Sequence, residues 1–140
     1  MMTKFEMLPP LIIGAAPEST EVGTVRRFPP RPTSVAKARK FAISSIDADG
    51  DLSSKVESLV SELATNAVRH ARTPFLVAVR SDERGVRVDV TDSSPEPPHM
   101  RPIDPVDPTG RGLVVVEALA DRWGYESDSA GKTVWFEIDR

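Results

Sequence analysis

The chain has 140 residues, 39% hydrophobic and 28% charged, a balance that predicts one globular domain with a sizeable core. Its net charge of −3 disfavours nucleic acid as the main partner. The absence of cysteine excludes disulfides, thiolate metal sites and cysteine nucleophiles and fits a cytoplasmic protein, while two histidines, His70 and His99, are too few for a histidine-rich metal site.

The first 23 residues show no clear hydrophobic period and predict a flexible N-terminal arm, with one domain following over residues 24–140. Residues 11–16 form an apolar run. However, Glu6, Pro9 and Pro10 precede this run, and it is far shorter than the ~20 residues that a membrane span needs. We therefore expect neither a signal peptide nor a membrane segment.

A short strand over residues 24–28, ended by two prolines, and a helix ending near residue 45 are expected next. Thr33 or Ser34 is expected to cap the helix. The apolar stripe of this helix consists of Val35, Ala38, Ala42 and Ile46. The acidic turn at residues 47–51 resembles the first half of a calcium loop, but its twelfth position is Ser58 instead of glutamate, so we exclude calcium.

A helix over residues 52–71 is the centre of the functional prediction. At about 100° per residue, its apolar positions fall within one sector roughly 80° wide. These positions are Leu52, Val56, Leu59, Leu63 and Ala67, and His70 is expected to project into the same sector. Glu62 and Asn66 are four residues apart and lie together at the edge of the stripe. They can hold a hydrated cation between them; the alternative is two solvated polar residues beside a core stripe.

Two strands, residues 75–80 and 86–92, predict a hairpin whose turn ends at Gly85. Because side chains alternate along a strand, Asp92 shares a face with Val86, Val88 and Val90. A carboxylate on an apolar face needs a hydrogen-bond donor, which favours a ligand-binding role. The alternative is a carboxylate that bends out to water at the end of the strand.

A proline-rich segment, residues 93–109, predicts either a functional lid or disorder. It leads into Gly110, Arg111, Gly112 and Leu113, which begin a largely apolar helix expected to reach Trp123. Glycines at a helix start let backbone N–H groups approach an anion, and an arginine suits phosphate oxygens. The chain closes with strands over residues 124–127 and 133–138 joined through Gly131.

In this order the motifs resemble those of the histidine-kinase-like ATPase superfamily, which includes the gyrase and Hsp90 N-terminal domains. The chain is most similar to small bacterial ATP-binding regulators of the anti-sigma-factor serine kinase type. Residues 61–71 match their N-box, residues 110–113 their second glycine box, and residues 131–135 their final strand motif. The resemblance extends over about residues 24–138.

The resemblance implies an α+β fold, a two-layer sandwich in which helices pack on one face of a mixed, mostly antiparallel sheet. ATP and Mg²⁺ are the implied cofactors. Asn66 would coordinate the magnesium ion, Glu62 would orient or deprotonate the attacking hydroxyl, and Asp92, supported by Thr133, would accept a hydrogen bond from adenine. The phosphates would be lined by Gly110, Arg111, Gly112 and Leu113.

The implied function is that of a protein serine kinase that holds a sigma factor and phosphorylates an anti-anti-sigma-type antagonist. We expect no direct binding of nucleic acid or membrane, and a homodimer is one possible oligomeric state. The chain departs from the family at the first glycine box, where Asp92 is followed by Ser93-Ser94-Pro95-Glu96 instead of a pattern with two glycines. This departure keeps two alternatives open: a non-catalytic protein-binding module that is nucleotide-dependent or nucleotide-free, and a fold whose pocket is empty.

Overall fold

The computed structural model of the chain describes residues 23–96 and 112–140. The predicted flexible arm, except Gly23, and the larger part of the proline-rich segment lie outside the described residues. In chain order the elements are β1 (Gly23–Phe28), α1 (Thr33–Ser44), α2 (Gly50–Asn66), the π-helical turn η2 (Ala67–Ala71), β2 (Phe75–Ser81), β3 (Gly85–Asp92), α3 (Gly112–Leu119), β4 (Arg122–Asp128) and β5 (Gly131–Asp139).

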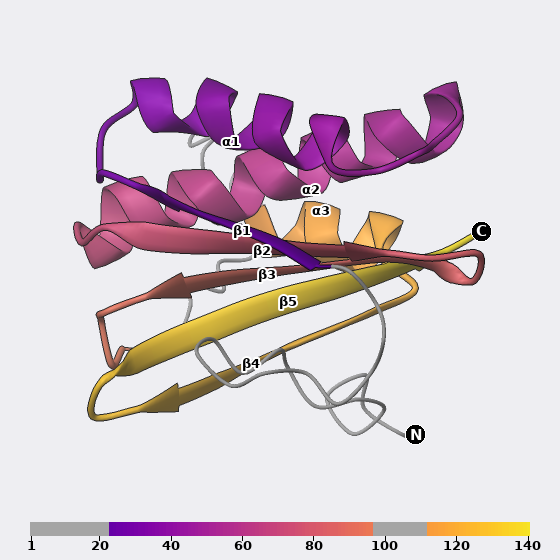
Figure 1. Cartoon of the computed structure of the whole chain (residues 1–140). Coiled ribbons are helices and arrows are strands. Elements are labelled where there is room, and N and C mark those ends of the chain that lie inside the picture. Colours follow the sequence, from indigo (N-terminus) through magenta and orange to yellow (C-terminus); the bar gives the residue numbers. More distant parts are fainter. Residues whose placement is uncertain (1–22, 97–111) are drawn as a thin grey trace, which may run out of the picture.

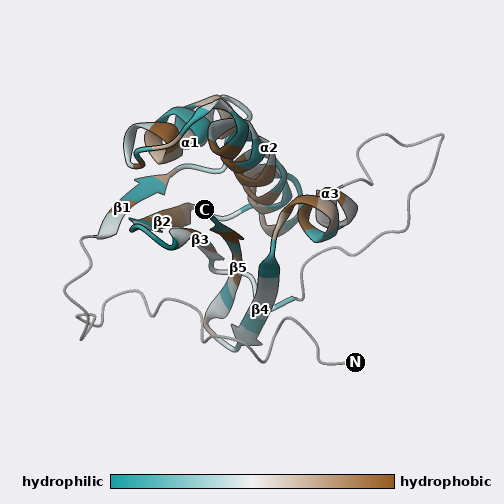
Figure 2. Cartoon of the chain, turned by 90° about the vertical axis from the view of Figure 1, so that its right-hand side faces the viewer, coloured by the Kyte–Doolittle hydropathy of each residue, from teal (hydrophilic) through white to brown (hydrophobic). Residues whose placement is uncertain are grey.

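The domain has two layers, a five-stranded sheet and a layer of helices α1, α2 and α3 on one face of that sheet (Figures 1 and 2). The strand order is β1-β2-β3-β5-β4. The predicted two-layer α+β fold is therefore confirmed. All the strand pairs of the described residues are antiparallel, so the sheet is not mixed. None of the helices in the described ranges has both the length and the apolar character that crossing a membrane requires.

Side chains alternate between the two faces of the sheet, and the apolar ones that face the helices form the core between the two layers. Val77, Val90 and Val134 lie side by side on β2, β3 and β5, and all three are buried. At the β1 edge, the rings of Phe28 and Phe75 stack with centroids 5.5 Å apart, and Phe41 of α1 meets Phe28 edge-on. Because the apolar faces of both layers are buried against each other, the polar side chains of the site are held on a closely packed frame.

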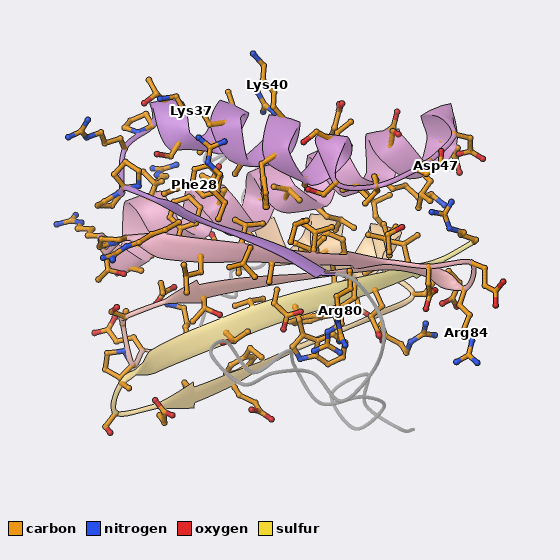
Figure 3. All side chains as sticks on the ribbon, viewed as in Figure 1. Phe28, Lys37, Lys40, Asp47, Arg80 and Arg84 are labelled. Carbon is orange, nitrogen blue, oxygen red and sulfur yellow. The ribbon has the colours of Figure 1, made fainter. Side chains whose placement is uncertain are left out.

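Helix α1 begins without the side-chain cap that its sequence predicts. Its N-cap residue is Pro32, which makes no capping hydrogen bond, so the prediction of Thr33 or Ser34 at this position is wrong. The Ser34 hydroxyl instead donates to the Pro29 carbonyl at 2.7 Å and is buried. Figure 3 shows Lys37 and Lys40 pointing from α1 away from the sheet, as expected for the solvated face of an amphipathic helix.

Helix α2 is capped by Asp49, whose carboxylate accepts a hydrogen bond from the Leu52 N–H at 2.9 Å. The predicted apolar stripe is confirmed, since all five of its residues are buried. After Asn66 the helix widens into the π-helical turn η2, which ends where Arg72 adopts a left-handed conformation with φ 57°. The side chain of His70 is exposed, so the prediction that it projects into the buried apolar stripe is wrong. The prediction assumed a regular α-helix, and the π-helical turn shifts the angular positions of the side chains that follow it around the helix axis.

Helix α3 ends at Leu119, four residues before the predicted end, and Trp123 belongs to strand β4. Pairing with β5 competes with helix formation here. Trp123 lies opposite Phe136, and the Arg122 guanidinium forms ion pairs with Glu137 and Asp139. This sheet pairing, which local helical pattern does not reveal, decides the structure of residues 120–123.

The sheet face opposite the helices carries buried charges. Arg87 Nε donates to Asp89 Oδ1 at 3.0 Å, and the Arg87 guanidinium lies 4.4 Å from the ring centroid of Trp135. Glu137 is 3.7 Å from Arg87 Nη1. Arg80 lies on this same side of the sheet in Figure 3, which matches its position across from Arg87 in the β2–β3 register. A stacked, carboxylate-paired arginine is a stable arrangement only while its partners remain.

Candidate functional site

Glu62 and Asn66 lie one turn apart near the C-terminal end of α2, and both are partly buried. Burial raises the pKa of the Glu62 carboxyl above its usual value of 4.5. A carboxylate with a raised pKa accepts a proton more readily, which is what a general base requires.

The Asn66 amide nitrogen is buried and makes no hydrogen bond with any residue that the structure describes. The nitrogen and oxygen of an amide exchange places when the group turns over. This position therefore offers either a donor for a phosphate oxygen or an oxygen ligand for a cation, and an unpaired buried polar atom favours binding such a partner.

Asp92 ends β3 on the face turned toward the helices, as alternation predicts, and is 6% exposed. The alternative of a carboxylate bent out to water is wrong. Lys132 Nζ lies 2.9 Å from Asp92 Oδ2 and 3.2 Å from Oδ1, and the Ser94 N–H donates to Oδ1 at 2.8 Å. The donor that a buried carboxylate needs is thus supplied within the chain itself.

Thr133 does not support Asp92 in this structure. Its hydroxyl lies 2.8 Å from the Thr91 hydroxyl, directly across the β3–β5 pair, so both threonines are on the opposite face from Asp92. The residue across from Asp92 is Lys132, which the motif-based prediction missed. Lys132 alternates in phase with Val134, Phe136 and Ile138, so period-two alternation along this strand would have placed it on the apolar face, which Asp92 shares.

Gly131 brings the backbone of β5 close to the end of β3. It adopts φ 154°, a conformation that residues with side chains rarely take. A Cβ at this position would collide with the Asp92 carbonyl oxygen and lie 3.0 Å from Ser93 Cα. The glycine predicted as a hairpin residue therefore also sets the position of the Asp92 backbone.

The predicted phosphate-binding motif is only partly within the described residues. Gly110 and Arg111 lie outside them, and Gly112 begins α3. Helix α3 packs against α2, with Val116 fully buried. The start of α3 therefore belongs to the same helix layer as Glu62 and Asn66.

The topology relates the two halves of the candidate site. Helix α2 and its π-helical extension η2, which starts directly after Asn66, both contact β3, the strand that Asp92 ends. Within the described ranges, no group of three or more histidine, aspartate or glutamate side chains forms a metal site by itself. A magnesium ion held by one amide oxygen together with nucleotide phosphates needs no such cluster, so the buried Asn66 amide fits this mode of binding.

A shallow surface pocket between α1 and α2, lined in part by Arg39 and Glu57, contains none of the predicted site residues.

A family model described as the histidine kinase-like ATPase domain matches residues 28–138, and the chain therefore belongs to the histidine kinase-like ATPase family. The predicted family is thus confirmed.

Among solved structures, the chain is similar to the crystal structure of the RsbU and RsbW domains of Rv1364c from Mycobacterium tuberculosis. The TM-score is 0.65 and the sequence identity 18%, and the match covers 85% of this chain and 33% of that one. This likeness supports the fold, and the chain spans about a third of the matched protein. No match was found among curated proteins.

Proposed function

We propose that the chain is an ATP-binding regulatory protein that acts as a protein serine kinase of the anti-sigma-factor type. The observation that carries the proposal is the pair on α2. A carboxylate whose pKa is raised by burial lies one turn before an amide whose nitrogen is buried and has no hydrogen-bond partner among the described residues. The chain's membership of the histidine kinase-like ATPase family supports it. Its proposed partners are a sigma factor and an anti-anti-sigma-type antagonist, in a cytoplasmic setting.

Each site residue has one role in this proposal. Asn66 binds the magnesium ion or the phosphates through its amide, and Asp92 accepts a hydrogen bond from the adenine amino group. Gly110, Arg111, Gly112 and Leu113 lie along the phosphates at the start of α3. When bound, Mg-ATP would supply the phosphoryl group, and its magnesium ion would offset part of the negative charge of the phosphates.

Glu62 takes the proton of the antagonist's serine hydroxyl. The serine oxygen then bonds to the γ-phosphorus as the bond from that phosphorus to the β–γ bridging oxygen breaks, and ADP leaves.

A second candidate function is a binding module that docks a protein partner without turning nucleotide over. The observation that favours it is the pairing of Asp92 with Lys132, together with a serine and proline sequence where glycines would allow close approach to a base.

Calorimetric titration of the purified chain with Mg-ATP, with ATP in EDTA and with Mg-GTP tests both candidates. A second assay follows transfer of radiolabelled γ-phosphate to candidate antagonist proteins. Mg-ATP binding with transfer supports the kinase, and binding without transfer to any genuine partner supports the nucleotide-dependent module. If neither nucleotide binds, the proposed kinase is wrong.

A further inference from the structure

The contact between Lys132 and Asp92 leaves the Asp92 carboxylate with little capacity for a ligand. A carboxylate has about four positions at which it accepts hydrogen bonds. The ammonium of Lys132 contacts both oxygens, at 2.9 Å and 3.2 Å, and the Ser94 N–H takes a further position on Oδ1 at 2.8 Å. Asp92 and Lys132 are each 6% exposed, so a ligand reaches this carboxylate only after a side chain has moved.

The backbone holds the two residues in this relation. Asp92 and Lys132 are directly opposite each other in the antiparallel β3–β5 pair, which places their side chains on the same face. Gly131 fixes the separation of the two strands at this end, because its bare backbone packs against the Asp92 carbonyl. The lysine ammonium therefore remains beside the carboxylate unless its long side chain turns away.

We propose that Lys132 is a binding-site residue that occupies the nucleobase position, is displaced when a base binds and so sets the affinity of the site. The proposal rests on the proposed role of Asp92 in recognising adenine. In this arrangement, the exocyclic amino group of the base competes with an ammonium that is already bound. The base gains a hydrogen bond to Asp92, while the buried ammonium loses one, so the net gain is small. Lys132 thereby lowers the affinity of the site for adenine nucleotides.

Replacing the lysine by a short side chain reverses this balance. In Lys132→Thr the carboxylate stays buried without its charged partner, and an incoming amino group then satisfies it. A hydrogen bond to an unpaired charged group in such a site corresponds to about a tenfold gain in affinity or more. Because the effect arises at the base, it is expected for adenosine, which has no phosphates, as well as for Mg-ATP.

The test compares adenosine and Mg-ATP binding by calorimetry in the wild type, in Lys132→Thr and in Lys55→Thr. Lys55 is the matched control, because it forms an ion pair with Asp51 at 3.5 Å on the surface of α2, away from the sheet. We expect affinity for both ligands to rise at least about tenfold in Lys132→Thr, and to stay at the wild-type value in Lys55→Thr. Weaker Mg-ATP binding with unchanged adenosine binding would show that Lys132 contacts phosphate, and would overturn the proposal, as would unchanged affinity for both ligands.

Loss of the ion pair lowers stability, so Lys132→Met serves as a second variant that fills the volume of the lysine stem without its charge. A gain in adenosine affinity in this variant also supports the proposal, and no gain in a folded Lys132→Met contradicts it. If the wild type binds Mg-ATP and neither folded variant gains affinity, this inference fails and the proposed function stands. If the variants bind and the wild type does not, the inference stands and ATP-dependent activity of the natural chain fails.

Discussion

The backbone of Gly131 packs so closely against the carbonyl of Asp92 that no side chain fits between them. The site carboxylate at the end of β3 therefore depends on a glycine in the β4–β5 hairpin. The same strand end carries the Lys132 ammonium, which is paired with that carboxylate. The position of Asp92, its charge partner and its access to ligand are thus decided together by the β3–β5 pairing.

Gly131→Ala is expected to lower the free energy of unfolding by about 1–3 kcal/mol for the conformation alone, with a further loss from the collision with the Asp92 carbonyl. Chemical denaturation measures this change. Gly50→Ala is the matched control, because a Cβ at Gly50 meets no atom within 4 Å and lies in the first turn of α2. The control is expected to match the wild type or to exceed it slightly. Equal stability of Gly131→Ala and the wild type would contradict the close approach.

Asn66→Ala is expected to abolish the magnesium dependence of ATP binding while leaving the fold intact. The truncation removes a buried amide nitrogen that has no partner among the described residues, so little stability is lost. Calorimetry with and without EDTA gives the magnesium dependence, and thermal unfolding gives the stability. A collapse of thermal stability in the unliganded variant would mean that Asn66 is structural.

Asp92→Asn is expected to weaken ATP binding, because the adenine amino group loses a charged acceptor. The loss is expected to be about ten- to a hundredfold, or ~1.5–3 kcal/mol, in the Lys132→Thr background, and smaller in the wild type, where displacement of the Lys132 ammonium offsets part of that hydrogen bond. It also leaves the Lys132 ammonium buried without a charged partner, which lowers stability by on the order of 3 kcal/mol. Binding is measured at a temperature at which the variant is folded. Asp51→Asn, a change at an exposed carboxylate, serves as the control. Unchanged ATP affinity in Asp92→Asn would remove Asp92 from base recognition.

Glu62→Gln separates binding from chemistry, because glutamine keeps the shape of the side chain and lacks its basicity. We expect Mg-ATP affinity within a few-fold of the wild type and phosphate transfer lower by about two orders of magnitude or more. Radiolabelled ATP with a cognate serine-bearing partner measures the transfer. Equal transfer in both proteins would exclude Glu62 from the mechanism.

The raised pKa of Glu62 also predicts a pH dependence of stability. Burial disfavours the charged form in the folded state, so this group costs stability at neutral pH, and the cost disappears as the pH falls through the folded-state pKa toward 4.5. Glu62→Gln is therefore expected to be more stable than the wild type at pH 7, with the difference shrinking as the pH falls toward 4.5 and absent below it. Denaturation at a series of pH values measures this difference, and one that grew toward acid pH would have the wrong sign.

Arg87→Met tests the buried charges on the sheet face opposite the helices. Removing the guanidinium leaves Asp89 and Glu137 without this ion-pair partner, and a loss of about 3–5 kcal/mol is expected. Lys55→Met breaks an exposed ion pair instead and is expected to cost ~1 kcal/mol or less. The two variants are compared by denaturant unfolding. Similar small losses in both would show that the Arg87 contacts contribute little to stability.

Most of the elements followed from local pattern, because apolar period and turn residues are encoded over short stretches of chain. The α2 stripe and the buried position of Asp92 were predicted on this basis, since helical and strand periodicity fix which side chains share a face. The ordered motifs also pointed to the family that the comparison confirms. Where a local pattern was broken, at the π-helical turn after Asn66, the prediction for His70 failed.

The sequence by itself determined the face on which Asp92 lies and the pair of Glu62 and Asn66 on one helix, because both follow from local periodicity. Its motifs indicated the two-layer fold through their resemblance to a known family. Only the tertiary structure decided that Trp123 belongs to a strand and that Lys132, forty residues from Asp92, pairs with it. Both outcomes depend on the register between β5 and its neighbouring strands. Register is set by packing across the whole sheet, so no local stretch of sequence contains it.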